Sequence, residues 1–203
     1  PYNDSESQGT FWVNLPDFAS SIESLQLQRG VGTSSNGSGS FGASLNIETD
    51  RSTKEGFAQI ANSYGSFDTK KHSVKFSTGL LNDRVEVSGR LSNITSDGYI
   101  DRASSDLKSY FLQGFYKTDN TNIKALVFGG REVTYQSWFG IDAQTVDTNP
   151  TFNPAGLYTD DQGVVRFHQN QVDDYDQDHY QLIWNQRYNN NWSTSATLNY
   201  TKG

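Results

Sequence analysis

Four carboxylates lie together near the end of the chain. Asp174, Asp176 and Asp178 alternate, and Asp173 stands beside them. Carboxylate oxygens are the ligands that Ca²⁺ prefers, so this spacing raises the question of a calcium site. The glycine and the closing glutamate of an EF-hand loop are missing, which favours an acidic loop in contact with water. We therefore predict no metal site here.

The three histidines are the other candidates for metal-binding or proton-transfer chemistry. His72, His168 and His179 are far apart in the sequence. His72 and His179 fall in stretches with strand patterns, which favours ordinary lumen, interface or surface positions over metal ligation. The chain has no cysteine, so neither a disulfide nor a thiolate site is possible. No nucleophile stands with a base, and the sequence predicts no enzyme, no metal and no cofactor.

A glycine-rich stretch, QLQRGVGTSSNGSGSFGASLNIET, occupies residues 26–49. A phosphate-binding loop needs a strand, the pattern GxxxxGK[ST] and then a helix. Here no lysine follows the glycines, and residues 43–47 are typical of a strand. The composition of residues 33–39 also fits a flexible linker. Strand-like flanks at 25–28 and 45–47 favour instead a tight, hairpin-like crossing in which backbone packs on backbone.

Composition limits what the chain can be. It has 203 residues, 33% of them hydrophobic and 13% aromatic, and a net charge of −7. The aromatic content favours a folded chain, and the lack of a basic cluster argues against a nucleic-acid partner. The sequence has no run of 18 apolar residues and so predicts no membrane helix. The strands of a membrane barrel, however, are only half apolar. Met is missing, even at position 1, which suggests a piece of a longer protein.

Alternation of apolar and polar residues predicts strands beyond about residue 56. In the clearest one, Trp192, Ala196 and Leu198 face one way, and Ser195 and Thr197 the other. A period of two with one apolar face is typical of a strand between two different environments. The predicted strands are residues 56–64, 72–80, 84–92, 110–117, 123–130, 180–188 and 192–200. On these strands Val74, Phe76, Val85, Val87 and Leu91 are expected on the lipid side, and Lys75, Glu86 and Arg90 on the lumen side.

The connections between these strands alternate in length. In chain order they cover residues 65–71, 81–83, 95–109, 118–121, 133–178 and 189–191. Every second one is short and carries Asn or Asp, which tolerate positive φ in hairpin turns. Short turns alternating with long loops are typical of an outer-membrane barrel. A soluble antiparallel sandwich also alternates apolar and polar residues; polar faces suited to a wet lumen and aromatics near strand ends favour the barrel.

The N-terminal quarter carries a family resemblance. An apolar strand ending in Arg-Gly (residues 24–30), a glycine-rich crossing (36–43) and a final strand (45–49) follow one another. This order resembles the end of the plug domain of TonB-dependent outer-membrane receptors. Residues 2–9 (YNDSESQG) and 11–17 (FWVNLPD) resemble the preceding plug segment of the Bacteroidetes members. More loosely, their barrel loops and strands resemble residues 149–156 (NPTFNPAG) and 178–182 (DHYQL).

The resemblance implies an all-β fold: a 22-stranded transmembrane antiparallel β-barrel with an N-terminal plug, of which about seven strands are present here. Residues 1–52 would form the C-terminal part of the plug domain and residues 53–203 the first barrel strands. Seven strands cannot close around such a plug, because barrel diameter grows with strand number. The remaining strands, the first half of the plug and the TonB box are therefore expected outside this sequence. The residues expected to pack the plug are Arg29, Gly30, Gly37, Gly39 and Gly42.

The resemblance also implies a function: active transport in the outer membrane of a Gram-negative bacterium. A scarce ligand, an iron–siderophore or cobalamin-like complex, would be imported with energy from the TonB complex. Import of a glycan with a surface lipoprotein is an alternative within transport. A soluble β-sandwich binding or adhesion module is the alternative from another class.

The longest predicted connection, residues 133–178, is the expected ligand-binding loop. It is rich in aromatic and amide side chains, which supply rigid contact area and orientation. The candidate residues are Tyr135, Trp138 and Phe139 in this loop, with Asn3, Asp4, Glu6 and Gln8 at the plug apex. The alternative is that the loop aromatics only pack the loop against itself.

Overall fold

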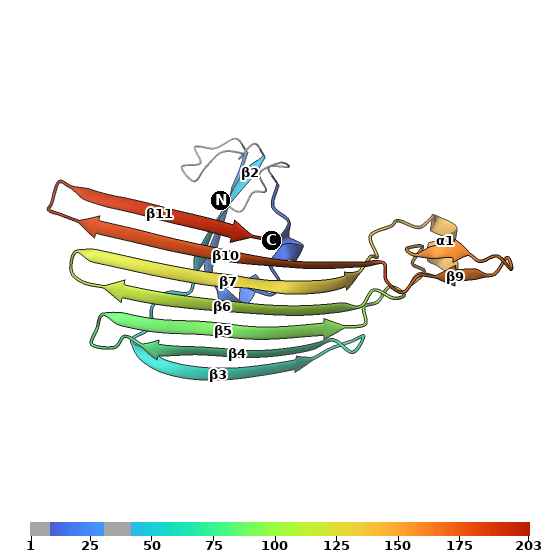
Figure 1. Ribbon diagram of the computed structural model, residues 1–203, viewed down its shortest axis with the longest axis horizontal. Coiled ribbons are helices and arrows are strands. Elements are labelled where there is room, and N and C mark those ends of the chain that lie inside the picture. Colours follow the sequence, from blue (N-terminus) through green and yellow to red (C-terminus); the bar gives the residue numbers. More distant parts are fainter. Residues whose placement is uncertain (1–8, 31–41) are drawn as a thin grey trace.

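A computed structural model describes residues 9–30 and 42–203, and it is built almost wholly of antiparallel strands (Figure 1). The helical segments of this part are short: η1 (Trp12–Asn14), η2 (Phe18–Ser21) and α1 (Ala143–Thr148). Within the described residues, no helix is long and apolar enough to cross a membrane.

Seven strands form one antiparallel sheet with the order β11-β10-β7-β6-β5-β4-β3. They are β3 (Glu55–Tyr64), β4 (Lys70–Gly79), β5 (Val85–Ser96), β6 (Ser105–Lys117), β7 (Thr121–Tyr135), β10 (Val172–Arg187) and β11 (Ser193–Lys202). All seven predicted strands are thereby confirmed, and neighbours in the sheet are neighbours along the chain. Two hairpins complete the fold: β1 (Ile22–Arg29) with β2 (Ala43–Thr49), and β8 (Leu157–Thr159) with β9 (Val165–Phe167). A sandwich needs a second large sheet packed on the first, and the described residues form none.

The strands run further toward the long connections than the alternation predicted. β10 pairs with β7 all the way from Val172–Tyr135 to Gln186–Thr121. The acidic stretch 173–178 is therefore strand and not the loop that the sequence suggested. The backbone ladder needs no apolar side chain, so a strand that continues beyond its apolar rows carries no alternation to reveal it.

The two ends of the sheet differ, as predicted. Short turns lie at one end, on the left in Figure 1, and residues 65–69, 97–104 and 136–171 connect strands at the other. In the first short turn Asn82 and Asp83 both adopt positive φ, 50° and 55°. In the last, the Asn189 side-chain oxygen accepts hydrogen bonds from the backbone N–H groups of Asn191 and Trp192. These polar side chains satisfy backbone groups that the strands leave unpaired.

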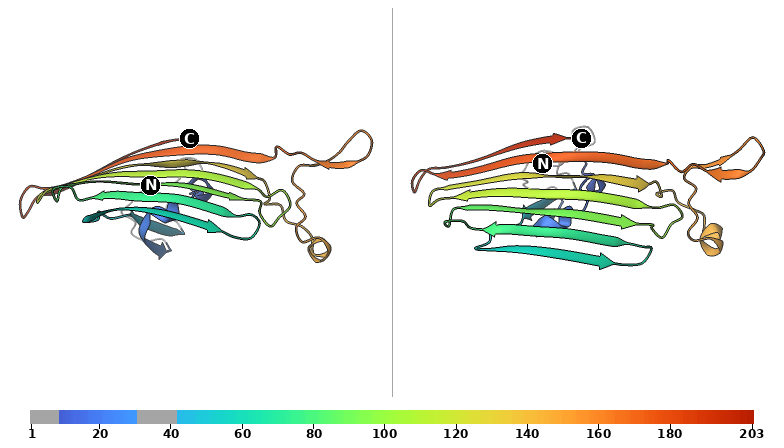
Figure 2. Two further views of the ribbon diagram at one scale, coloured as in Figure 1. Left: turned by 90° about the horizontal axis from the view of Figure 1, so that it is seen from below. Right: turned by 60° about the horizontal axis from the view of Figure 1, so that its bottom comes forward.

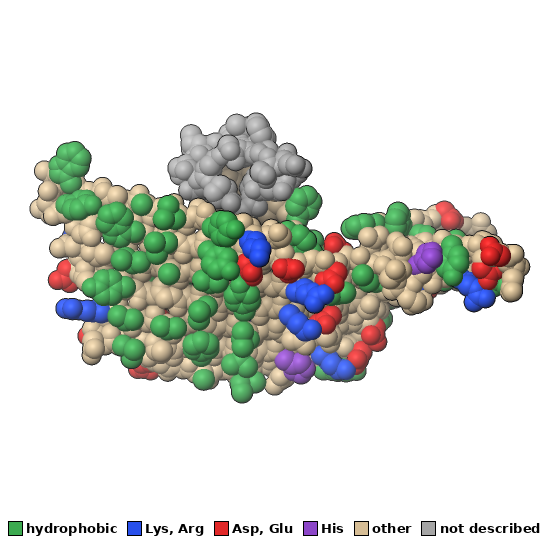
Figure 3. All heavy atoms as spheres, viewed as in Figure 1, with side chains coloured by type: hydrophobic (Ala, Val, Ile, Leu, Met, Phe, Trp, Pro, Cys, Tyr) green, Lys and Arg blue, Asp and Glu red, His purple; other side chains and the backbone are tan. Residues whose placement is uncertain are grey.

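One face of the sheet, here called the outer face, points away from residues 9–30 and is largely apolar. Cross-strand pairing aligns its side chains in rows, for instance Val87, Gly114, Ala125, Leu182 and Leu198. Figure 3 shows hydrophobic side chains spread over the part of this face toward the short turns. From Val85 to Leu91 on β5 the apolar rows extend about 20 Å, at about 3.3 Å per residue.

Charged rows follow the apolar rows toward the long connections. There Arg131 donates two hydrogen bonds to the Asp174 carboxylate, at 2.7 and 2.6 Å. Lys108 pairs with Asp106 in the same region. The outer face therefore changes from apolar to charged along the strands, and the division is visible right of centre in Figure 3.

The opposite, inner face carries the N-terminal segment, which both views of Figure 2 place on one side of the curved sheet. Leu15 and Phe18 pack there against Phe111, Leu126 and Phe128, all buried. The Phe18 and Phe128 ring centroids are 4.9 Å apart. Because of this core, β6 and β7 carry apolar residues on both faces.

Gly130 on β7 offers a test of this docking. A Cβ at Gly130 would clash with the Lys108 carbonyl oxygen and lie 2.6 Å from the Pro16 ring, whereas a Cβ at Gly114 would meet open space. Overpacking of this kind costs about 1–3 kcal/mol. We expect Gly130→Ala in the full-length protein to raise hydrogen exchange in residues 14–21, and Gly114→Ala to leave it unchanged. Equal exchange in the two variants would contradict the docked position of Pro16.

Candidate functional site

Four cations on the inner face hold the N-terminal segment in place. Lys71 and Lys75 come from β4, Arg90 from β5 and Lys124 from β7. Each donates a hydrogen bond to a residue between Asp17 and Asp50. Because alternate residues of a strand share a face, the same register that exposes the apolar side chains turns these cations inward. Lys75, Glu86 and Arg90 thus lie on the side predicted for them.

Asp17 is the acceptor at the centre of this contact. Its backbone is left-handed, with φ of 52°. Its carboxylate accepts hydrogen bonds from Arg90 Nη1 at 2.9 Å, Lys71 Nζ at 2.5 Å, Ser92 Oγ at 2.5 Å and Ser20 Oγ at 2.6 Å. Burial opposes ionisation, but these hydrogen bonds and the Arg90 charge outweigh it and lower the pKa of Asp17 below its ordinary value. Asp17 is therefore ionised at neutral pH.

Arg90 is the buried partner of Asp17. Its side chain is only 3% exposed, and its Nε donates to Ser21 Oγ at 2.8 Å while Nη1 also donates to Ser109 Oγ at 3.1 Å. A buried guanidinium is tolerated when its planar donors are satisfied. Here Ser109 of β6 and two residues of the N-terminal segment, Asp17 and Ser21, accept its hydrogen bonds together. The Arg90 side chain therefore ties the segment to the sheet.

A second anchor lies where β2 ends and the chain enters the sheet. Lys75 pairs with the Asp50 carboxylate at 2.7 Å. Lys124 donates to Thr49 Oγ1 at 2.7 Å and to the Asp50 carbonyl oxygen at 3.1 Å. Nearby, the buried Glu86 carboxylate accepts hydrogen bonds from the Thr53 backbone N–H at 3.2 Å and from Ser77 Oγ at 2.5 Å. Both ends of the docked segment are thus fixed by charged groups.

The strands that flank the glycine-rich stretch pair antiparallel, as their strand-like patterns predicted. β1 and β2 pair from Arg29–Ala43 to Ile22–Thr49, and the Gly30 N–H donates to the Gly42 carbonyl oxygen at 2.7 Å. Among the described residues, no atom lies within 4 Å of a Cβ at Gly30 or Gly42, so the close packing predicted for these two glycines stays a prediction. Both glycines lie beyond the last paired residues, where no described element covers them. Gly37 and Gly39 lie outside the described residues.

Arg29 is exposed at the end of β1, where it is the register partner of Ala43 on β2. Its role in plug packing stays a prediction, as does the division of the chain into plug residues 1–52 and barrel residues 53–203.

The long connection, residues 136–171, forms a small lobe containing α1 and the β8–β9 hairpin, and it extends beyond the end of the sheet (Figures 1 and 2). Tyr135 is buried at its base, where its hydroxyl donates to the His168 carbonyl oxygen at 2.5 Å. Tyr158 stacks on His168 with ring centroids 4.2 Å apart. The lobe thus has internal contacts of its own, in line with the alternative that its aromatics pack the loop against itself.

The neighbouring connection, residues 97–104, clamps this lobe. The Arg102 guanidinium lies 3.8 Å from the centre of the Phe167 ring and donates to the Asn153 carbonyl oxygen at 2.5 Å. Asn153 is fully buried, and its amide donates to the carbonyl oxygens of Asp101 and Gln136, each at 3.0 Å. These contacts hold the lobe in one orientation relative to β5 and β6.

The predicted ligand-binding residues of the loop have different environments. Trp138 is 71% exposed and Phe139 is 54% exposed, so both are accessible from solvent. Tyr135 is buried and contacts the lobe from inside, and its part in ligand binding stays a prediction. The other candidates, Asn3, Asp4, Glu6 and Gln8, lie outside the described residues.

Several of the acidic and histidine residues considered for metal binding have protein partners. Asp178 accepts a hydrogen bond from the Tyr110 hydroxyl at 2.7 Å, and Asp174 pairs with Arg131. His179 stacks on Phe128 with ring centroids 4.8 Å apart. In residues 9–30 and 42–203 no group of three or more His, Asp or Glu side chains is placed to hold a metal ion.

Comparison with known proteins gives a similar fold. Neither a protein-family model nor a curated protein sequence matches the chain. Among solved structures, a match is the ferripyoverdine receptor of the outer membrane of Pseudomonas aeruginosa bound to ferripyoverdine, with a TM-score of 0.66 and 14% sequence identity. The match covers 89% of this chain and 24% of that receptor. The chain therefore has the fold of part of an outer-membrane receptor, and it spans about a quarter of that receptor's length.

Removing the Asp17 charge tests the docking contact. Asp17→Asn would leave the Arg90 charge buried without its counter-charge, and loss of one partner of a buried pair costs about 3–5 kcal/mol. We expect the variant to expose residues 9–30 to limited proteolysis in the full-length protein. The matched control is Asp68→Asn, which removes an exposed ion pair with Lys70, and exposed pairs contribute little to stability. Resistance of Asp17→Asn equal to that of the control would show that the network does not hold the segment.

Proposed function

We propose that this chain is part of an outer-membrane receptor of a Gram-negative bacterium that imports a scarce ligand. One observation carries the proposal: a single curved sheet exposes apolar rows on its outer face while its inner face is covered by the chain's own N-terminal segment. Soluble monomers rarely expose a continuous apolar patch beyond a few hundred Å². Lipid is the environment that suits this face, and the fold of the ferripyoverdine receptor supports that assignment.

The charged rows support a membrane orientation in which the long connections lie outside the bilayer. These rows follow the apolar rows toward residues 97–104 and 136–171. The strands β7 and β10, which extend in that direction, are 15 and 16 residues long. A tilted barrel strand needs only about 9–11 residues to cross the bilayer. The extra length would carry the lobe outward from the membrane, and the short turns would lie on the periplasmic side.

The ligand that we propose is an iron–siderophore or cobalamin-like complex, captured by the 136–171 lobe. Exposed aromatic side chains on a rigid support are well suited to binding, because little conformational entropy is lost when the ligand docks. Trp138 and Phe139 have this position, close to the buried Tyr135. The similar receptor is bound to ferripyoverdine in its structure, which supports a metal complex as the ligand class.

Import would be driven by a TonB-type periplasmic partner acting on the N-terminal segment. The contacts that such a pull must break are the ion pairs of Asp17 and Asp50 with the inner-face cations. Transport of this kind needs no covalent chemistry from the chain, because the ligand would pass once these ion pairs have rearranged.

Two neighbouring residues of β11 test the membrane assignment. Leu198 is 68% exposed on the outer face, and Thr197, also exposed, points to the inner face. An Arg facing lipid near the bilayer midplane costs about 2–4 kcal/mol. We therefore expect Leu198→Arg in the full-length protein to impair assembly into the outer membrane, measured by heat-modifiable gel mobility, and Thr197→Arg to assemble. Equal assembly of both variants would contradict the membrane-barrel proposal.

The lobe's role in binding is tested by removing its exposed rings. We expect Trp138→Ala with Phe139→Ala to weaken binding of a ligand found in a panel of ferric siderophores and cobalamin, by about 1–3 kcal/mol if these rings are binding hot spots. Assembly should stay normal. Val146→Ala, which truncates another exposed apolar side chain of the lobe, is the control. Unchanged affinity in the assembled double variant would remove the two rings from the binding site.

A further inference from the structure

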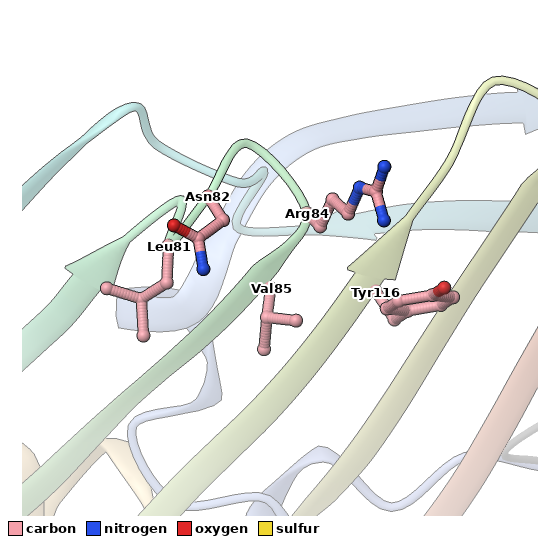
Figure 4. A pocket seen from close by; sticks show the side chains of 5 residues that line it. All are labelled: Leu81, Asn82, Arg84, Val85 and Tyr116. Atoms are coloured by element: carbon pink, nitrogen blue, oxygen red, sulfur yellow. The ribbon is translucent and has the colours of Figure 1, made fainter.

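An open pocket of about 560 Å³ lies at the short-turn end of the sheet. Five residues line it: Leu81, Asn82, Arg84, Val85 and Tyr116 (Figure 4). They come from the β4–β5 turn, the start of β5 and the end of β6. The pocket is therefore built at the edge of the apolar rows, far along the sheet from the 136–171 lobe.

Backbone pairing places the apolar lining residues side by side. Leu81 and Val85 form a bridge across the turn, with the Leu81 N–H donating to the Val85 carbonyl oxygen at 2.7 Å. Val85 is the register partner of Tyr116. All three side chains are exposed, so they form a continuous apolar strip that ends at the turn.

Arg84 adds an uncompensated charge to this strip. Its carbonyl oxygen accepts a hydrogen bond from the Lys117 N–H at 2.8 Å, which fixes the backbone, but among the described residues its guanidinium has no hydrogen-bond or ion-pair partner. Asp83, the next residue along the chain, forms no ion pair with it. Arg187, at another short turn of the same end, instead donates to the Asp119 carbonyl oxygen at 3.3 Å and to the Asn120 side chain at 3.4 Å. Among the described residues, Arg84 therefore differs from this matched neighbour in that its guanidinium donors have no partner.

We propose that this pocket binds one membrane phospholipid, with its headgroup phosphate on Arg84 and an acyl chain along Leu81, Val85 and Tyr116. The inference rests on the proposed membrane location of the sheet. A guanidinium matches the geometry of a phosphate and binds it through two parallel hydrogen bonds. Tyrosine is enriched at the level of the headgroups, where its ring is apolar and its hydroxyl meets water. An anionic group above an apolar chain is the ligand chemistry that complements both parts of this pocket.

The test compares two arginines at the same end of the barrel. Full-length protein in detergent is titrated with phosphatidylglycerol, and bound lipid is counted by native mass spectrometry. A lost charge-assisted contact is expected to lower occupancy of the tightest site about tenfold in Arg84→Gln. Arg187→Gln, whose guanidinium is already engaged, should bind like the wild type. Tyr116→Ala should also weaken binding, and Tyr116→Phe should retain most of it.

Two outcomes would overturn the inference. Occupancy unchanged by both Arg84→Gln and Tyr116→Ala would show that the lipid binds elsewhere. Displacement of the lipid by millimolar inorganic phosphate would show a site for a free anion and not for a phospholipid. Failure of the proposed membrane function would be recognised separately, because the full-length protein would then stay folded and soluble without detergent.

Discussion

The antiparallel register of the seven-stranded sheet is the constraint on which the other features depend. Successive side chains of a strand point to opposite faces, so a slip of one residue would exchange the two faces completely. In the observed register Leu198 and its row are exposed on the outer face, while Arg90 and Glu86 are buried beneath the N-terminal segment. A slip of one residue would place these charges on the apolar side. The cost of such an exchange fixes the register more firmly than the turns alone, whose Asn and Asp residues only permit it.

The inner face combines apolar packing with buried charge, and the two contributions differ in kind. Phe18 packed on Phe128 supplies area removed from water, which stabilises docking without demanding a fixed orientation. The Asp17–Arg90 pair supplies orientation, because burying either charge without its partner is costly. The pair contributes little net stability compared with an apolar contact of equal size. A segment held in this manner is specific in position and yet separable by a directed force, a combination that suits the proposed coupling to a periplasmic partner.

Much of the sheet could be predicted from the sequence, and the missing parts have physical reasons. Period-two alternation located all seven strands, and the same alternation placed Lys75, Glu86 and Arg90 on the inner side. It could not find the acidic end of β10, because a ladder of backbone hydrogen bonds leaves no apolar signature. Asp17 carries no local signal, since its partners Lys71, Ser92 and Arg90 are distant in sequence. The contacts that clamp the 136–171 lobe were missed for the same reason: Arg102 and Asn153 meet only after β6 and β7 have brought their loops together.

Contacts between neighbouring loops also explain why the 136–171 lobe can be both long and ordered. A loop of this length pays a large conformational entropy if it must become ordered on binding. Here the ordering occurs during folding, through the buried Asn153 amide, the Tyr135 hydroxyl and the Arg102 contact with Phe167. Trp138 and Phe139 then remain exposed next to a base that is already fixed. An exposed ring on a fixed base loses only its own side-chain freedom when a ligand docks, so the buried Tyr135 at the base of the lobe would favour the ligand capture that we propose for these two residues.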